Sequence, residues 1–111
     1  MDTVLKALAE PRRREILRLV WSRELAATSI ADHFGDVTRP AISQHLAVLK
    51  AAGLVSERRD GTRRLYQARH EEMRKLRDFL DDYWTTGLER LRDVAEAAQR
   101  EKGASDGRTR P

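Results

Sequence analysis

The sequence predicts a mainly α-helical fold with one small β-hairpin and a long C-terminal helix. Apolar residues recur at spacings of three and four in several separate stretches, as they do along one face of a helix. This period changes to two short extended runs on either side of Asp60-Gly61, a dipeptide that favours a tight hairpin turn. With 111 residues, the chain has the length of one small domain.

Three short helices are expected in the first 37 residues. The first carries the apolar residues Val4, Leu5 and Leu8, and Pro11 interrupts it because proline cannot continue a helix. A second helix follows from about residue 12 and turns several apolar residues toward the core: Ile16, Leu17 and Val20, with Trp21 beside them. A third helix, over residues 28–34, precedes a turn at residues 35–37.

The stretch 38–52 predicts a further helix with a defined start and end. Thr38 can cap it, because a threonine hydroxyl accepts a hydrogen bond from a first-turn amide, and Pro40 falls where a missing N–H costs nothing. Gly53 ends the helix, since glycine takes the left-handed conformation at little steric cost. One face of this helix is apolar: Ile42, Leu46, Leu49 and Ala52. The other face is polar and has no acidic residue: Arg39, Ser43, Gln44 and Lys50.

A basic hairpin over residues 56–66 follows this helix directly. Two pairs of arginines flank its turn: Arg58, Arg59, Arg63 and Arg64. Residues 39–70 hold seven Arg and Lys against two acidic residues, a net charge of +5, whereas residues 1–38 are balanced and residues 71–111 carry −1. The positive excess of the chain therefore lies in this stretch, which favours a polyanionic partner.

The order of these elements (short helix, turn, second helix, basic hairpin) is that of a winged helix-turn-helix. An amphipathic surface helix alone would show the same apolar stripe, so the 38–52 helix by itself indicates DNA binding only weakly. The acid-free face and the paired arginines favour double-stranded DNA as the partner. Arginine can donate two hydrogen bonds to guanine, and glutamine can pair with adenine. Arg39 and Gln44 are the candidates for these base contacts, with Ser43 contacting a base or a phosphate.

From about His70 to Gln99 the sequence predicts one long helix with a broad apolar stripe. The small core of residues 4–66 cannot cover so broad a stripe, so we expect a homodimer. The alternative is that Phe79 and Trp84 cap the core of the single chain. The expected interface residues are Leu5, Leu8, Leu76, Phe79, Leu80, Tyr83, Trp84, Leu88 and Leu91. One domain over residues 1–100 is thus expected, followed by a disordered Gly- and Ser-containing tail at residues 101–111.

The composition excludes several other classes of protein. Without cysteine, the chain has no disulfides, thiolate metal sites or thiol redox chemistry, and its three histidines lack metal-ligand spacing, so no metal or cofactor is expected. No apolar run reaches the ~18–20 residues of a membrane span. The N-terminus does not resemble a signal peptide, so a cytoplasmic location is expected. Nothing assembles a nucleophile, a base and an oxyanion stabiliser, so the chain is not expected to be an enzyme.

Three segments, EPRRREILRLV, TRPAISQHLAVLKAAGLV and RRDGTRRLYQ, resemble the ArsR-type winged-helix transcriptional repressors across about residues 3–95. The resemblance implies a homodimer that represses an operator near its own gene. It also implies the DNA-facing residues: Thr38, Arg39, Pro40, Ser43, Gln44, His45, Arg58, Arg59, Arg63 and Arg64. Lys50, on the polar face of the same helix, is expected to add sequence-independent attraction to phosphate. The chain departs from the metal-sensing members of that family. Ala26, Ala27 and Thr28 stand where many of them carry cysteines, and no histidine follows His70.

A dimer places two 38–52 helices about one DNA turn apart, ~34–36 Å, and so predicts an inverted-repeat operator. Repression would follow from steric exclusion of polymerase, while the sequence leaves activation open. Release by a small ligand, by a partner protein or by falling protein concentration also stays open, and the sequence names no inducer. The rival class is a winged helix that binds protein, which the arginine density of the hairpin disfavours.

Overall fold

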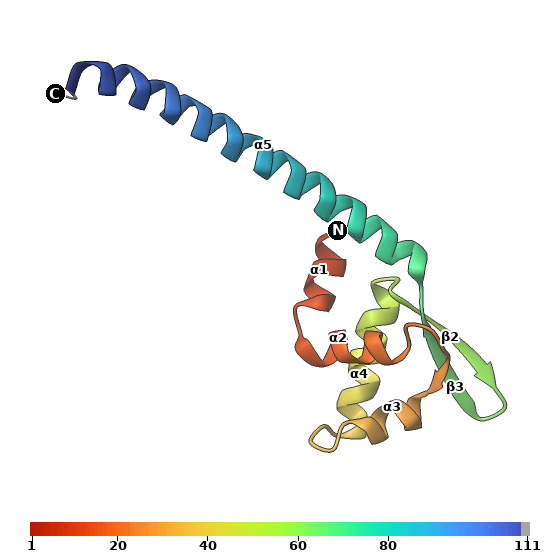
Figure 1. The fold of residues 1–111 in the computed structure, drawn as a ribbon. Coiled ribbons are helices and arrows are strands. Elements are labelled where there is room, and N and C mark those ends of the chain that lie inside the picture. Colours follow the sequence, from red (N-terminus) through yellow and green to blue (C-terminus); the bar gives the residue numbers. More distant parts are fainter. Residues whose placement is uncertain (110–111) are drawn as a thin grey trace. The chain divides into compact units, whose positions relative to one another are not determined.

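The computed structural model describes the backbone of residues 1–109 and the side chains of residues 1–102. Its elements in chain order are α1 (Asp2–Leu8), α2 (Pro11–Leu19), β1 (Leu25–Ala26), α3 (Ala27–His33), α4 (Arg39–Ala51), β2 (Val55–Asp60), β3 (Arg63–Ala68) and α5 (His70–Thr109) (Figure 1). This order confirms the predicted fold class. The chain separates into two compact units, Met1–Leu76 and the part from Arg77 onward, which are described in turn.

Two helices of the first unit have a proline in their first turn and a side chain that caps their N-terminus. Pro11 is the first residue of α2, and the carboxylate of Glu10 accepts a hydrogen bond from the Arg13 N–H at 3.1 Å. In α4 the Thr38 hydroxyl accepts a hydrogen bond from the N–H three residues on, at 3.3 Å, as the sequence predicted. Gly53 follows the end of α4 with a φ of +77°, a left-handed conformation that glycine adopts without strain. These features hold α4 at the predicted bounds.

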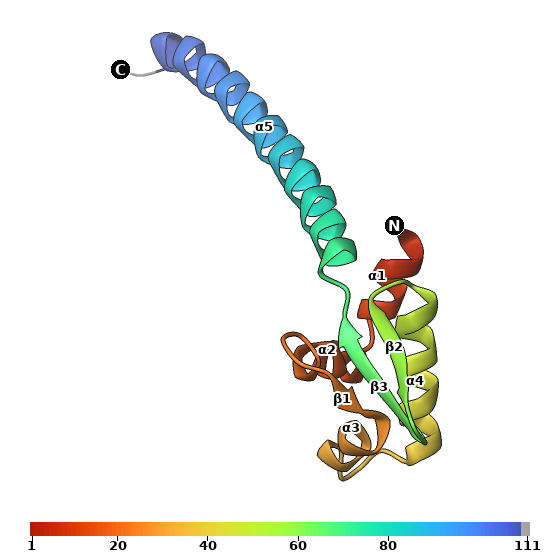
Figure 2. The same cartoon turned by 90° about the vertical axis from the view of Figure 1, so that its right-hand side faces the viewer.

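The hairpin is part of a three-stranded antiparallel sheet with the order β1-β3-β2 (Figure 2). Asp60 lies opposite Arg63, so the two-residue turn is Gly61-Thr62, one residue later than the sequence suggested. Its glycine has a φ of +64°, as the first position of a type II′ turn requires. The third strand, β1, pairs with β3 and places Ala26 opposite Leu65. The sequence did not predict β1, because two residues are too short to show an alternating pattern.

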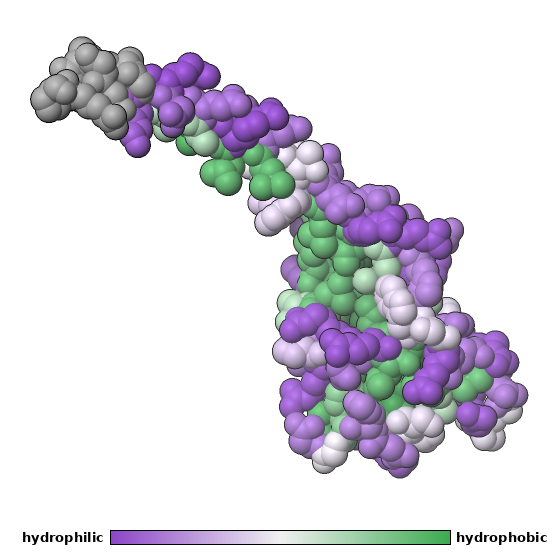
Figure 3. Space-filling model, viewed as in Figure 1, coloured by the Kyte–Doolittle hydropathy of each residue, from purple (hydrophilic) through white to green (hydrophobic). Residues whose placement is uncertain are grey.

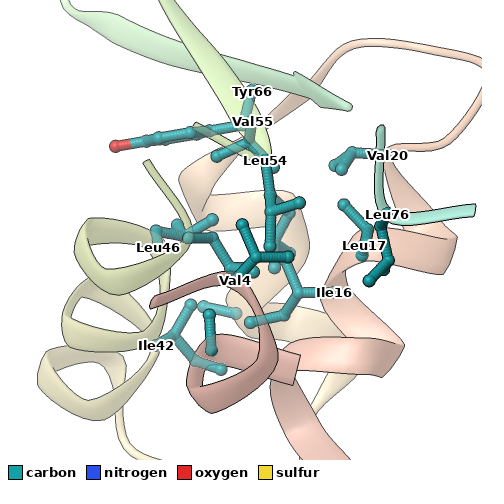
Figure 4. Close-up of a cluster of buried hydrophobic side chains, with 14 residues drawn as sticks. Val4, Ile16, Leu17, Val20, Ile42, Leu46, Leu54, Val55, Tyr66 and Leu76 are labelled. Atoms are coloured by element: carbon teal, nitrogen blue, oxygen red, sulfur yellow. The ribbon is translucent and has the colours of Figure 1, made fainter. Parts of the chain in front are cut away.

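The core of Met1–Leu76 draws on its helices and on the sheet. Ile16 of α2, Ile30 of α3 and Leu49 of α4 are 0% exposed. Figure 4 shows how the apolar faces of α1, α2 and α4 converge beneath the hairpin. The prediction that Leu76 lies at a dimer interface was wrong, because its side chain is 7% exposed and packs in this core. It belongs to the part of α5 that completes the first unit.

The second unit consists of the rest of α5. Most of its large apolar side chains are exposed, and Figure 3 shows apolar surface gathered along one side of this helix. These exposed residues are Leu80, Tyr83, Trp84, Leu88, Leu91 and Val94. The backbone of α5 continues to Thr109, through most of the predicted tail at 101–111, whose side chains lie mostly outside the described part of the chain and whose disorder stays a prediction. No described helix is both long and apolar enough to cross a membrane.

Candidate nucleic-acid interface

The polar face of α4 is held outward by the burial of its opposite face. Ile42, Leu46 and Leu49 are buried in the core, so the helical period leaves Ser43 and Gln44 exposed to solvent. Both side chains carry hydrogen-bonding groups that suit base edges. This exposed face is the part of the molecule that a DNA groove could accept.

Arg39 stands at the first turn of α4, at the edge of the same face. Its guanidinium lies 3.6 Å from a carboxylate oxygen of Asp32 in α3, and both side chains are largely exposed. An exposed ion pair of this kind is screened by water and contributes little free energy. Arg39 can therefore exchange Asp32 for a partner on DNA at little cost.

The wing, defined as β2, β3 and their turn, presents two arginines on one side of the sheet. Arg59 lies directly opposite Arg64, so their side chains project from the same face of the ladder. Like charges at directly opposed positions repel each other. Within the described part of the chain, no acidic side chain forms an ion pair with either arginine or with Arg63. An anion placed between Arg59 and Arg64 would relieve this repulsion.

Arg64 links the wing to the helix-turn-helix. Its side chain lines a hollow of about 180 Å³ together with Arg39 and Ser43 of α4 and Thr28 of α3. It also lines a second hollow of about 280 Å³, to which Thr28 and Arg63 contribute. The two hollows bring guanidinium and hydroxyl donors from three elements together, which is the chemistry that binds phosphate oxygens.

Thr28 lies at this surface although the sequence did not predict it there. It is exposed in the first turn of α3 and lines both hollows beside Arg64. A threonine that follows two alanines at the start of a short helix has no distinctive pattern. Only the approach of the wing to α3 gives this hydroxyl a place at the candidate interface.

Besides Arg39, two further cations predicted to face DNA have acidic partners within the chain. Arg58 donates two hydrogen bonds to the carboxylate of Glu24, at 2.9 and 2.8 Å. This pairing lowers the pKa of Glu24 and raises that of Arg58, mainly through the hydrogen bonds. Lys50 lies 3.5 Å from the carboxylate of Glu57. Both cations therefore hold the wing in position, and less of their charge is available to phosphate than the sequence suggested.

Glu57 connects the wing to α4 through a second contact. The hydroxyl of Tyr66 donates a hydrogen bond to the Glu57 carboxylate at 2.9 Å. This bond lowers the pKa of Glu57, with Lys50 adding to the effect, while burial raises the pKa of Tyr66 and the nearby carboxylate raises it further. The cluster fixes the base of the wing against the helix that carries Gln44.

His45 does not share the exposed face of α4. Its side chain is 17% exposed, with Nδ1 3.4 Å from the Arg13 guanidinium and Nε2 4.0 Å from the Glu10 carboxylate. Position 45 is one turn after Ile42 and borders the buried stripe, so its ring turns toward α2. The structure thus removes His45 from the predicted DNA-facing set. Thr38 and Pro40 remain exposed at the start of α4.

In the part of the chain that is described, no three His, Asp or Glu side chains lie close enough together to hold a metal ion. The acidic groups instead contact basic side chains, as Glu15 does with His33 at 3.5 Å and with Arg18 at 3.8 Å. The described surface is thus organised around hydrogen-bond donors and arginines.

Comparison with known proteins gives this surface a context. Residues 10–57 match the family described as "Bacterial regulatory protein, arsR family". The HTH-type transcriptional regulator Rv2034 of Mycobacterium tuberculosis is 44% identical over 87 residues, which is 78% of this chain and 80% of that protein. The transcriptional repressor SdpR of Bacillus subtilis is 43% identical over 61 residues, or 55% of this chain and 67% of that protein. A homodimeric winged helix-turn-helix DNA-binding domain from Mycobacterium bovis superposes with a TM-score of 0.62 and 37% identity, covering 73% of this chain and 77% of that one.

Proposed function

The chain belongs to the arsR family of bacterial regulatory proteins and is a DNA-binding transcriptional regulator, and from this premise we propose that it is a homodimeric repressor of an inverted-repeat operator. It is a regulator and not an enzyme. The observation that carries the proposal is the hollow where Arg64 of the wing meets Arg39 and Ser43 of α4. There a base-reading face and a phosphate-binding group lie side by side.

Base readout comes from the exposed face of α4. Gln44 can pair with an adenine through its amide, and Arg39 can donate two hydrogen bonds to a guanine. Ser43 lies between them in sequence and also lines the hollow at Arg64. Its hydroxyl can therefore form a hydrogen bond with a base edge or with a phosphate oxygen. These three residues set the preferred sequence of each half-site.

Phosphate binding comes from the wing. Arg59, Arg63 and Arg64 are exposed, and Thr28 adds a hydroxyl beside Arg64. Their attraction is mainly independent of sequence, because neutralised phosphates release counterions whatever the bases are. The wing thus supplies affinity for DNA of any sequence, while α4 supplies the preference for particular bases.

Dimerisation involves the exposed apolar stripe of α5. The residues proposed for the interface, with Leu76 removed, are Leu5, Leu8, Phe79, Leu80, Tyr83, Trp84, Leu88 and Leu91. An apolar stripe of this extent on a lone helix favours burial against another chain. The homodimeric domain from Mycobacterium bovis supports the same assembly here. Repression then follows if the bound dimer blocks polymerase, and SdpR is a named repressor among the relatives.

A selection experiment tests this function directly. Random duplex DNA is bound by the purified full chain at physiological salt, and the bound fraction is sequenced after repeated rounds. We expect enrichment of an inverted repeat whose half-site centres are ~10 base pairs apart or a whole number of turns more. Enrichment of a single half-site would overturn the dimeric operator, and no enrichment at all would overturn sequence-specific repression.

A further inference from the structure

A hollow of about 310 Å³ lies between α1, α2 and the start of α5, inside the first unit, and none of its lining residues is a candidate DNA contact. We name it the Trp21 pocket after one of its six lining residues: Leu8, Arg14, Leu17, Arg18, Trp21 and Met73. Its volume is at the lower end of the range of about 300–1,000 Å³ for small-molecule pockets, which is room for one aromatic side chain. The proposed DNA contacts make no use of it.

The indole of Trp21, which forms one wall of the pocket, is held in place by contacts with His70 of the same chain. Trp21 stacks on the ring of His70 with centroids 4.6 Å apart, and Nε2 of His70 lies 2.6 Å from the Trp21 carbonyl oxygen. The indole is nevertheless 40% exposed. An exposed but fixed aromatic surface loses little conformational entropy when a partner packs on it.

The rim of the pocket is positively charged. The guanidinium of Arg14 donates hydrogen bonds to the carbonyls of Leu8 and Ala9, at 2.7 and 3.2 Å. Arg18 is 81% exposed, with Glu15 at 3.8 Å as its only ion-pair partner among the described residues. An apolar pocket with arginines at its rim suits an apolar group that has an anion beside it.

The same chain carries such a group in its second unit. Tyr83 and Trp84 are 72% and 68% exposed, and Asp81 and Asp82 precede them directly. Asp81 lies one turn before Trp84 in α5, so the carboxylate and the indole share a side of the helix. Neither aspartate has an ion-pair partner among the described residues. The aromatic ring and its neighbouring charge complement the pocket and its rim.

We propose that the indole of Trp84 of one copy packs into the Trp21 pocket of a second copy, with Asp81 of the first facing Arg18 of the second. Two-fold symmetry forms this contact twice in each dimer, because every contact of residue i with the partner's residue j recurs as a contact of j with the partner's i. The inference rests on the proposed homodimer and assigns its specificity to one apolar contact and one charge pair. The second copy is the occupant because the chain itself presents both complementary surfaces.

A charge exchange tests the contact in the full chain. Arg18→Glu and Asp81→Arg each place like charges at both contacts of a homodimer, and we expect each to raise the dimer dissociation constant about tenfold at low salt. An equimolar mixture of the two variants has opposite charges at both contacts of the heterodimer. Sedimentation equilibrium measures the dimer dissociation constant. For the mixture and for the double variant we expect this constant to lie within about threefold of that of the original protein.

Two further variants separate the proposed contact from a general effect of charge on the dimer. Asp93→Arg makes the same charge change at another exposed position of α5, and neither it nor its mixture with Arg18→Glu should show this pattern of loss and recovery. Trp84→Ala should raise the dissociation constant by more than tenfold. A dimer that persists without any recovery in the mixture overturns the Trp84 contact and leaves the dimer standing. A chain that stays monomeric at micromolar concentration overturns both, and thermal unfolding by circular dichroism verifies that each variant is folded.

Discussion

The two units of the chain differ in whether their large apolar side chains are buried. In Met1–Leu76, Leu49 and Leu54 are 0% exposed, whereas Leu88 and Leu91 in the second unit are 48% and 64% exposed. Each large apolar side chain that is fully buried stabilises a fold by about 1.5–3 kcal/mol. The DNA-facing unit therefore gains its stability within one chain. The exposed stripe of α5 can gain a comparable amount only from another surface, so its burial depends on assembly.

Charge follows the same division. The positive excess lies within residues 39–70, while residues 71–111 carry a net charge of −1. In the second unit, acidic residues stand beside the exposed aromatic residues, as Asp81 does beside Trp84. The acidic residues beside these aromatic side chains disfavour contact with DNA phosphates and attract a basic protein surface. The two units thus differ in the partner that their charge favours, DNA or protein, as well as in the burial of their apolar side chains.

The largest effect is expected from a core substitution in the first unit. Leu49→Ala removes a side chain that is 0% exposed and should lower the free energy of unfolding by about 2–5 kcal/mol. The same change at Leu91, which is 64% exposed, should lower it by less than ~0.5 kcal/mol when the protein is dilute enough to be monomeric. Urea denaturation monitored by circular dichroism measures both. Equal losses in the dilute protein would contradict the contrast between the units.

The next effect concerns base preference. Gln44→Ala should cost about 1–3 kcal/mol on the selected operator and flatten the preference at one base pair of each half-site. Ala47→Ser is the matched control, because position 47 is exposed on α4 and is not among the proposed base contacts. Fluorescence anisotropy with operator variants measures the change. A uniform loss on every duplex would contradict a base-reading role for Gln44.

A smaller effect separates the arginines of the wing. Arg64→Ala should weaken operator and scrambled DNA alike and reduce the slope of log K against log salt by about one unit. Replacing Arg58 and Glu24 together by glutamine removes an internal ion pair without changing net charge, so the slope should stay the same. Titrations at several salt concentrations measure both. A reduced slope in the double variant would show that Arg58 also contacts phosphate.

Much of this organisation could be predicted from local signals in the sequence. Thr38, Pro40 and Gly53 specify the start and end of α4 through backbone chemistry that needs no tertiary contact, and the structure agrees. The sequence could not predict which charged groups meet across elements. Glu24 lies 34 residues from Arg58, and only the fold brings the two together. The same reason explains why Thr28 was missed at the candidate interface.

Helical periodicity also has a limit, which His45 and Leu76 illustrate. It places a residue on a face of its helix, but a residue at the border of that face can turn either way. His45 borders the apolar stripe of α4 and turns toward Arg13, while Leu76 continues the apolar stripe of α5 but packs in the core. What lies beside the helix decides the outcome, and a single sequence does not contain that information.

The smallest effect expected is a pH dependence at the base of the wing. The hydrogen bond from Tyr66, aided by Lys50, lowers the pKa of Glu57 below its ordinary value near 4.5. A carboxylate whose pKa is lower in the folded state stabilises the fold above its unfolded pKa, and this contribution is lost as pH falls through the folded pKa. Glu57→Gln should therefore lower the free energy of unfolding by about 1 kcal/mol or less at pH 7, since the side chain is 18% exposed. The difference from the original protein should shrink below pH ~4.5 and vanish in stronger acid.

Thermal unfolding between pH 7 and pH 3 measures this dependence, with Asp60→Asn as the control for loss of one carboxylate at the exposed end of the wing. The control lacks a partner such as Tyr66, so it should not reproduce the acid-dependent difference. A constant difference across the whole range would mean that Glu57→Gln acts through packing and not through its charge. In that case the wing would be held to α4 by shape alone, and the contrast between a self-contained DNA-facing unit and an exposed helix would rest on apolar burial without an ionic contribution.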